Sequence, residues 1–213
     1  KGYYRVTSNR LRTCCDPLST YNVPISVSMA FKGILWYNIL NVDYLMIKLR
    51  DHQLSILNTL QDNRKGQVIV PTGGGKTMCM IEDAKYHLQF NSTPKTIVVV
   101  APRILLAQQL CKDFLELIDN VHVLHVHSGE THHTSTTKID LIREWVGDNV
   151  GNKIIFTTYH SLHKLMESDV FVDTIYFDES HNSVQKNFIE ATEYYSMYAN
   201  RCYFFTATPK HSK

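Results

Sequence analysis

The chain has 213 residues and a mass of 24.6 kDa, which suffices for one large domain, or for one domain with a small accessory. Apolar residues make up 44% of the sequence and charged residues 20%, a composition that excludes a disordered chain. The formal net charge of +2 excludes a strongly basic nucleic-acid arm or an acidic tail at the level of the whole chain. The charge is uneven, however, because residues 1–48 carry six Lys or Arg against two Asp or Glu, and residues 49–213 carry sixteen against eighteen.

Neither a disulfide framework nor a membrane span is indicated. The five cysteines are odd in number and form no C-x-x-C pair, so we expect reduced thiols in a cytosol-like, cytoplasmic compartment. The most apolar early stretch, residues 25–47, is interrupted by Lys32 and Asp43, whereas a transmembrane helix needs about 20 predominantly apolar residues. We see no secretory signal, and because the sequence starts at Lys1 we expect a fragment or a processed product.

The sequence changes character near Leu49. Residues 1–48 are rich in aromatic side chains, and we expect them to form an accessory segment that either grips a nucleic-acid backbone or packs against the rest of the protein. Beyond them, short apolar runs alternate with helical patterns. The expected strands are residues 67–70, 96–101, 121–126, 153–157, 174–177 and 202–206. The expected helices are residues 76–90, 104–118, 137–146, 161–167 and 184–198.

This alternation of strand and helix is typical of a doubly wound α/β domain with a mostly parallel sheet. We therefore expect one such domain over residues 49–213. Ligands of these sheets bind beyond the carboxyl ends of the strands. The chemistry is thus expected in the loops that directly follow the predicted strands.

The loop of residues 71–77 has the composition of a phosphate-binding loop. Its consecutive glycines are Gly73, Gly74 and Gly75. Such glycines let backbone N–H groups converge on phosphate oxygens, and the N-terminus of the following helix adds a favourable dipole. Lys76 can neutralise the β- and γ-phosphates, and the Thr77 hydroxyl can ligate Mg²⁺. The strict pattern G-x-x-x-x-G-K-[ST] is not met, because Val70 stands at the first glycine position, so a plain glycine-rich turn is the alternative.

Two acids, Asp178 and Glu179, follow the predicted strand at residues 174–177. A carboxylate at a strand end that faces the phosphate loop is where an Asp holds Mg²⁺ in P-loop NTPases. A second acid beside it can polarise the attacking water. Two solvated acids in a loop are the alternative interpretation. The position of the pair, at the end of an apolar strand downstream of a phosphate loop, favours the functional one.

Together, Gly-Gly-Gly-Lys-Thr and Asp-Glu-Ser-His resemble motifs of the first RecA-like domain of superfamily 2 helicases, in the DEAD/DEAH-like group. The resemblance covers about residues 49–209 and implies ATP and Mg²⁺ as cofactors. It assigns nucleotide binding to Gln53, Thr72, Gly73, Gly74, Gly75, Lys76 and Thr77, with Gln53 reading adenine. It assigns catalysis to Lys76, Asp178 and Glu179, and Mg²⁺ binding to Thr77 and Asp178.

Further segments resemble the family in the same order. APRILLAQQ at residues 101–109 resembles motif Ia, and TTYHSL at residues 157–162 resembles motif Ib. HSG at residues 127–129 lies where the family has a loop near its strand-contacting region, and TATP at residues 206–209 resembles motif III. The implied nucleic-acid contacts are Pro102, Arg103, Ser128, Gly129, Thr158 and Tyr159. The implied coupling residues are His181, Thr206 and Thr208. For Arg103 or Thr158, an ordinary role at a helix start fits the residue type equally well.

Three functions stay open. The first is the ATP-binding half of a helicase or translocase on single-stranded or duplex DNA or RNA. The second is the motor of a restriction or chromatin-remodelling type enzyme, which translocates along duplex without unwinding it. The third is a binding module without ATPase activity, which the intact Lys76, Asp178 and Glu179 disfavour. A full motor of this family has a second RecA-like domain with an arginine finger, and we expect that domain to be absent, since Arg201 is the only arginine after His181.

A cluster of histidines invites a metal-site interpretation. Its members are His122, His125, His127, His132 and His133. No cysteine lies near them in sequence, and structural zinc sites usually show paired Cys and His spacing. We therefore favour ordinary strand and loop histidines.

Overall fold

The computed structural model describes residues 5–7, 48–90 and 93–207 of the chain. Its strands are β1 (Arg5–Thr7), β2 (Lys65–Ile69), β3 (Thr96–Ala101), β4 (His122–Val126), β5 (Thr134–Ser135), β6 (Lys153–Thr158), β7 (Thr174–Phe177) and β8 (Arg201–Thr206). Its helices are α2 (Asp51–Asp62), α3 (Lys76–Gln89), α4 (Ile104–Leu115), α5 (Ile139–Asp148), α6 (Leu162–Glu167), α7 (Ile189–Tyr198) and the short 3₁₀ helix η1 (Ser180–Asn182).

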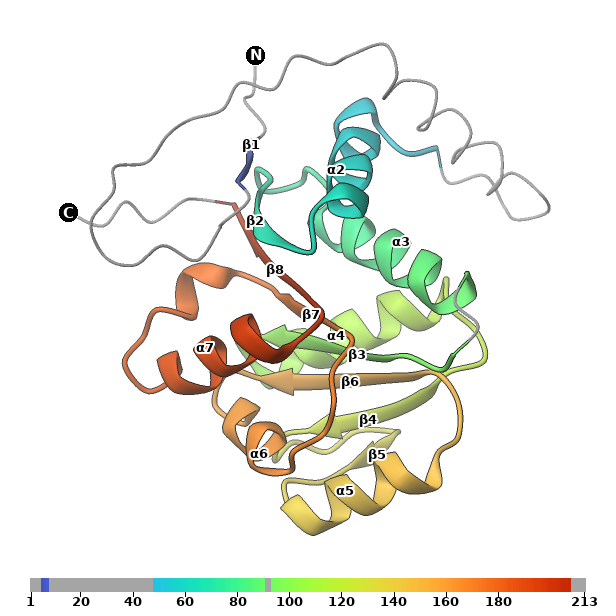
Figure 1. Cartoon of the computed structure of the whole chain (residues 1–213), viewed down its shortest axis with the longest axis vertical. Coiled ribbons are helices and arrows are strands. Elements are labelled where there is room, and N and C mark those ends of the chain that lie inside the picture. The colour runs from blue at the N-terminus through green and yellow to red at the C-terminus, as the bar shows by residue number, and fades with distance from the viewer. Residues whose placement is uncertain (1–4, 8–47, 91–92, 208–213) are drawn as a thin grey trace.

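These strands form one sheet in the order β1-β2-β8-β7-β3-β6-β4-β5. β1 pairs antiparallel with β2, and every other neighbouring pair is parallel. Helices lie on both faces of the sheet (Figure 1), so the predicted doubly wound, mostly parallel α/β class is confirmed. Because β2 to β8 run in one direction, their following loops meet along one side of the sheet, the carboxyl edge. The opposite side is the amino edge.

Strands in the middle of the sheet are buried on both faces, and β3 shows this most clearly, since all six of its residues are buried. Ile97 and Val99 pack on the face covered by α2, α3 and α4. Val98 and Val100 pack on the face covered by α5, α6 and α7. A continuous apolar run, without polar alternation, is what such a strand requires.

The predicted strands and helices are all present, and most of their ends agree within three residues. The largest difference is at α7, which was predicted to begin at Val184 and begins at Ile189. Residues 183–188 form successive turns instead, in which the Phe188 N–H donates to the Gln185 carbonyl at 2.8 Å. Val184 is 58% exposed in this segment, so its side chain adds little burial that would hold a helix against the sheet.

Four elements were not predicted: α2, β1, β5 and the 3₁₀ helix η1. α2 follows an amphipathic pattern, because its buried residues Gln53, Ile56, Leu57 and Leu60 recur at i, i+3, i+4 and i+7. β1 belongs to the predicted accessory segment and places Thr7 opposite Gln67 of β2. Apart from β1 and Lys48, residues 1–48 lie outside the described residues, so the accessory segment stays a prediction.

The amino edge holds a buried ion pair that fastens α3 to β8. Asp83 of α3 is fully buried and accepts two hydrogen bonds of 3.0 Å from Arg201, the first residue of β8. The Tyr176 hydroxyl and the Gln61 side chain also donate to this carboxylate. Arg201 therefore acts in the structure of the amino edge, away from the phosphate loop, as expected. None of the helices in the described ranges combines the length and apolarity needed to cross a bilayer.

Candidate active site

The phosphate loop, residues 71–77, connects β2 to α3 at the carboxyl edge. Gly73 and Gly75 have φ values of 74° and 81°, in the left-handed region that residues with a Cβ atom avoid. Between them, the Gly74 N–H donates to the Pro71 carbonyl at 2.9 Å. The glycines therefore fold the loop back on itself directly before α3 begins.

α3 starts at Lys76 without any side-chain cap on its N-terminus. The first N–H groups of a helix have no partner within the helix, and they lie at the positive end of its dipole. An anionic ligand in the loop can supply the missing acceptors. The predicted phosphate-binding role of the loop thus fits its geometry.

Three side chains at the start of α2 hold the outer side of this loop. Arg50 Nη1 donates to the Gly73 carbonyl at 3.2 Å, and Gln53 Nε2 donates to the Gly75 carbonyl at 3.4 Å. His52 Nε2 lies 2.8 Å from the Gly74 carbonyl. Because a carbonyl oxygen only accepts, this histidine nitrogen carries the proton.

These contacts set the direction in which the peptide units of the loop point. The carbonyl and the N–H of one peptide unit point in opposite directions. Holding the carbonyls of residues 73–75 therefore turns the N–H groups of the following residues away from α2. The Gln53 side chain is 5% exposed, and its Oε1 accepts from the Arg50 N–H at 2.9 Å, so both ends of its amide are bonded within the chain. Its adenine-reading role stays a prediction.

The acid loop, residues 178–183, follows β7. Its first peptide is tied to the sheet, because the Asp178 N–H donates to the Val100 carbonyl at 2.9 Å. Glu179 has a φ of 47°, a left-handed conformation that costs of order 1–3 kcal/mol for a residue with a side chain. The Asn182 side chain donates to the Glu179 carbonyl at 2.9 Å and helps to hold this turn. The sequence carried no sign of this strained backbone.

The two loops meet directly. Lys76 Nζ contacts Glu179 Oε1 as an ion pair, and His181 Nδ1 lies 3.4 Å from the other oxygen of the same carboxylate. Burial raises the pKa of the neighbouring Asp178 carboxyl, while the Lys76 ammonium acts in the opposite direction. A partly desolvated carboxylate of this kind is stabilised by a bound cation. Lys76, Asp178, Glu179 and His181 are thus brought together at one place.

The residues present fit a Mg²⁺ ion that is shared with a ligand. In the part of the chain that the structure describes, no three His, Cys, Asp or Glu side chains are arranged to hold a metal by themselves. Mg²⁺ in nucleotide sites usually takes one or two protein oxygens and completes its shell with phosphates and waters. Asp178 and Thr77 would supply the protein oxygens at this site.

The other predicted residues of the carboxyl edge differ in exposure. Arg103 and Ser128 are exposed, and Pro102 and Gly129 are half-buried. The loops after β3 and β4 pack together, because a Cβ atom at Gly129 would lie 2.5 Å from Ile104 Cγ2. The loops that carry these four residues therefore lie against each other at the carboxyl edge.

The predicted surface contacts through Thr158 and Tyr159 need correction. Their exposed fractions are 4% and 2%, so neither side chain presents a surface to nucleic acid in this structure. The Tyr159 hydroxyl instead donates to the Asp178 carbonyl at 2.9 Å. Aromatic residue type alone does not reveal whether a ring points outward or into the core, and the exposed residue of this loop is His160.

Of the predicted coupling residues, Thr206 is 1% exposed and its carbonyl accepts the Val70 N–H at 3.0 Å. This bond joins the end of β8 to the residue that precedes the phosphate loop. Thr208 lies outside the described residues.

Two members of the histidine cluster form a buried chain of hydrogen bonds. The Gly129 N–H donates to His127 Nδ1 at 3.2 Å, so a neutral His127 carries its proton on Nε2 and donates it to His125 Nδ1 at 2.9 Å. His125 must then be protonated on Nε2. Burial lowers the pKa of both rings, that of His125 to about 4. With their acceptor nitrogens used, the rings are not free to ligate a metal, which supports the favoured interpretation.

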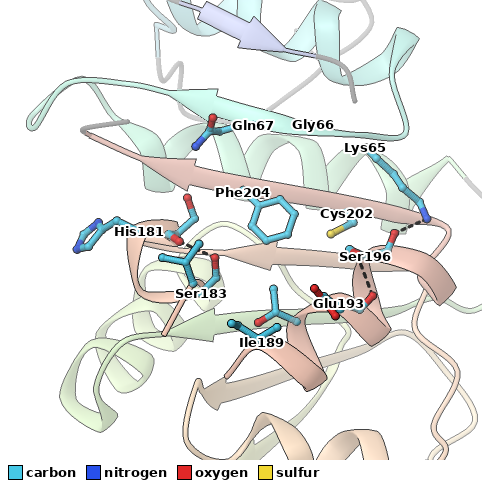
Figure 2. Close-up of a pocket in the computed structure, with 13 residues that line it drawn as sticks. Lys65, Gly66, Gln67, His181, Ser183, Ile189, Glu193, Ser196, Cys202 and Phe204 are labelled. Carbon is cyan, nitrogen blue, oxygen red and sulfur yellow. Dashed lines mark hydrogen bonds between the residues drawn. The ribbon is translucent and has the colours of Figure 1, made fainter. Parts of the chain in front are cut away.

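A separate cavity of about 500 Å³ lies beside the acid loop, between β2, β8 and α7. Figure 2 shows His181 at one end of it, Lys65 at the other, and Cys202 and Phe204 between them. Lys65 Nζ donates to the Ser196 carbonyl at 2.6 Å and so links β2 to α7. The phosphate loop contributes no residue to this cavity, which is therefore not the nucleotide site.

Several solved structures share this fold. The nuclease-deletion mutant of the Type ISP restriction-modification enzyme LlaGI, in complex with a DNA substrate mimic, matches with a TM-score of 0.67 and 22% identity over 78% of this chain and 18% of that chain. The Hef helicase domain of Pyrococcus furiosus matches with a TM-score of 0.60 and 20% identity over 78% of this chain and 34% of that one. The UvsW helicase from bacteriophage T4 matches with a TM-score of 0.61 and 14% identity over 84% of this chain and 60% of that one.

The chain thus spans less than two thirds of the length of each of these proteins. The matches confirm the predicted RecA-like fold. In sequence, no curated protein matches the chain. The model of the family described as "Type III restriction enzyme, res subunit" matches residues 46–211, a span that includes both the phosphate loop and the acid loop. The chain therefore belongs to the type III restriction enzyme res-subunit family, and it has the fold of the first RecA-like domain of superfamily 2 helicases.

Proposed function

We propose that this chain is the ATP-binding part of a nucleic-acid-dependent helicase or translocase, which couples ATP hydrolysis to movement on DNA or RNA. The observation that carries this proposal is the direct contact of Lys76, at the start of α3, with Glu179, after β7. This contact supports a site in which Lys76 is the phosphate-binding cation and Glu179 is the water-activating carboxylate, both acting on one ligand. Neither group alone would distinguish a motor from a phosphate-binding turn.

The roles of the residues follow from this arrangement. The N–H groups of residues 73–77 and the Lys76 ammonium bind the β- and γ-phosphates. Asp178 and the Thr77 hydroxyl hold Mg²⁺, which supplies positive charge to the phosphates when bound. Nucleotide phosphates draw Lys76 away from Glu179, and the released carboxylate orients the attacking water.

Nucleic acid binds on the loops after β3, β4 and β6, which are neighbours in the sheet. The exposed Arg103 and Ser128 and the backbone of residues 102, 129 and 158 contact its phosphates and sugars. Such contacts hold a strand without reading its sequence. We propose that this activity takes place in the cytoplasm, or in whichever compartment holds the nucleic acid.

A second candidate is the motor of a restriction type enzyme that translocates on duplex DNA without unwinding it. The family match and the likeness to the Type ISP enzyme, whose structure holds a DNA substrate mimic, favour this version and favour DNA over RNA. In either case a second RecA-like domain supplies an arginine finger, since Arg201 is held by Asp83 at the amino edge. Comparing the stimulation of ATPase activity by single-stranded and duplex DNA separates the two candidates.

Calorimetry with ATP and ADP in the presence of Mg²⁺ tests the nucleotide site. Lys76→Ala should weaken binding about tenfold or more while the melting temperature changes little, because Lys76 stands at the first position of α3 and its side chain makes a single ion pair at the carboxyl edge. Lys112→Ala, on the exposed side of α4, is the matched control and should bind as the wild type does. Equal affinity of Lys76→Ala and wild type would overturn the assignment.

A further inference from the structure

The buried Tyr159 joins the loop after β6 to the acid loop. β6 and β7 are not neighbours, since β3 lies between them in the sheet. The Tyr159 N–H donates to the Ala101 carbonyl at the end of β3 at 3.2 Å, and its hydroxyl reaches the Asp178 carbonyl at the end of β7 at 2.9 Å. One residue therefore spans the ends of three strands at the carboxyl edge.

The bond to Asp178 fixes a particular peptide plane. The carbonyl of Asp178 and the N–H of Glu179 belong to one peptide unit and point in opposite directions. Tyr159 holds the carbonyl, while the Glu179 N–H on the other side of the same peptide unit lowers the pKa of the Asp178 carboxylate. This plane directly precedes the left-handed Glu179, whose φ is 47°. Its orientation therefore sets the direction of both acidic side chains.

The ring of Tyr159 has little freedom to move independently of its surroundings. It lies 6.0 Å from the Phe177 ring and 5.7 Å from the Phe188 ring. The Phe188 ring also packs edge-on against His160, the exposed neighbour of Tyr159, at 4.7 Å. Burial raises the pKa of Tyr159 well above its ordinary value, so the hydroxyl keeps its proton and remains a donor at neutral pH.

We infer that Tyr159 is a positioning residue, through which the loop of residues 158–161 controls the orientation of Asp178 and Glu179. Nucleic acid on that loop then sets the geometry of the acid loop without touching the nucleotide. The inference rests on the proposed function, because it assumes that these acids serve hydrolysis and that this loop meets nucleic acid. It gives Tyr159 a role in turnover rather than in nucleic-acid affinity.

The test is Tyr159→Phe in the complete polypeptide that carries this domain. This variant removes one hydroxyl and keeps the ring. Turnover at saturating ATP and nucleic acid should fall about tenfold or more, since small misplacements of catalytic groups have effects of that size. The KM for ATP and the Kd for nucleic acid should stay within about twofold of wild type, because a residue acting on the chemical step changes turnover selectively. Turnover without nucleic acid should fall less than stimulated turnover.

Tyr203→Phe is the matched control. Its hydroxyl is also buried, and it donates to the Leu60 and Asn63 carbonyls at 2.9 and 2.6 Å near the amino edge. Both variants should show a similar, small drop in melting temperature for the lost hydrogen bonds, and only Tyr159→Phe should lose stimulated turnover. Equal losses of turnover in the two variants would reduce Tyr159 to a structural role and overturn the inference.

Two further outcomes also overturn it. One is wild-type stimulated turnover in Tyr159→Phe, and the other is weakened nucleic-acid binding with unchanged turnover at saturation, which would make Tyr159 a contact residue. Glu179→Gln, measured in parallel, separates this result from the proposed function. If Glu179→Gln also turns over as wild type does, the proposed function fails. If Glu179→Gln loses turnover and Tyr159→Phe turns over as wild type does, the inference fails and the proposed function stands.

Discussion

Each edge of the sheet holds an ion pair that includes a residue of α3, and the two pairs are built differently. At the amino edge, Asp83 is fully buried and receives Arg201, the Tyr176 hydroxyl and the Gln61 side chain. At the carboxyl edge, the side chains of Lys76 and Glu179 are 13% and 30% exposed, and they meet through a single pair of atoms. The carboxylate of the first pair is surrounded by further hydrogen-bond donors. The second pair can exchange its single contact for contacts with a ligand.

This difference separates a structural ion pair from a functional one. A buried charge whose hydrogen bonds are all satisfied has no bonding capacity left for a ligand. Removing one partner of such a pair leaves the other as an uncompensated buried charge. The pair at the carboxyl edge lies beside the uncapped start of α3 and on the strained turn at Glu179. Exposure, spare bonding capacity and strain gather at the edge where the proposed ligand binds. The same types of charged group therefore do different work at the two edges.

The largest effect that follows from this comparison is on stability. Asp83→Asn removes the counter-charge of the largely buried Arg201 guanidinium, and we expect a loss of about 3–5 kcal/mol in the free energy of unfolding. Denaturation by urea measures it. Lys76→Ala, at the open pair, should change this free energy by less than about 1 kcal/mol. Similar losses in the two variants would show that both pairs are structural.

The next effect is on catalysis at the open pair. Glu179→Gln keeps the shape of the side chain and removes its charge, so it should lower ATP turnover of the complete polypeptide by about 10²-fold, the scale of a lost general base. Nucleotide affinity should not fall, because Lys76 then loses a competitor for the phosphates. Steady-state kinetics and calorimetry give the two values. Unchanged turnover would move the role of base to another residue.

Much of the fold follows from simple patterns in the sequence. Runs such as residues 96–101 and 174–177 are apolar throughout, which a parallel strand buried on both faces requires. The meeting of the phosphate loop and the acid loop also follows, because parallel strands end at a common edge. α2 could have been predicted in the same way, since its buried positions have helical spacing.

The contacts that shape the site could not be predicted from the sequence pattern. The inward direction of Tyr159 depends on the rings of Phe177 and Phe188, which come from other parts of the chain. The left-handed turn at Glu179 depends on bonds from Tyr159 and Asn182 that no spacing rule contains. Residue type and order predicted which loops carry the chemistry. Tertiary packing decides how their side chains point.

A smaller effect concerns the histidine chain under the carboxyl edge. His125 has its pKa lowered to about 4, mainly by burial and further by His127 and His133. Between pH 6.5 and 4 the unfolded chain therefore takes up a proton at this residue that the folded chain does not. The free energy of unfolding should fall by about 1–3 kcal/mol as the pH drops through that window, and this contribution should level off below it.

Urea denaturation of wild type and His125→Gln at several pH values measures the contribution of His125 to the free energy of unfolding. The variant should show a flatter dependence between pH 6.5 and 4. His87→Gln is a control at a different position, since burial lowers the pKa of His87 to about 4 as well. The two differences should add, because the residues lie in separate networks. An identical pH dependence of His125→Gln and wild type would contradict the assigned neutral state of His125.

The smallest expected effect concerns the contact through which α2 holds the phosphate loop. His52 donates to the Gly74 carbonyl at 2.8 Å and lies on the side of the loop away from the proposed ligand. His52→Ala should therefore weaken nucleotide binding by about tenfold, equivalent to about 1.4 kcal/mol, through a less ordered loop. Because His52 acts on the backbone and not on the base, the same factor should appear for ATP, GTP and inorganic tripolyphosphate. Calorimetry with the three ligands gives the comparison. A loss confined to ATP would instead place His52 against the adenine, and the loop would then be ordered by its glycines and by α3 alone.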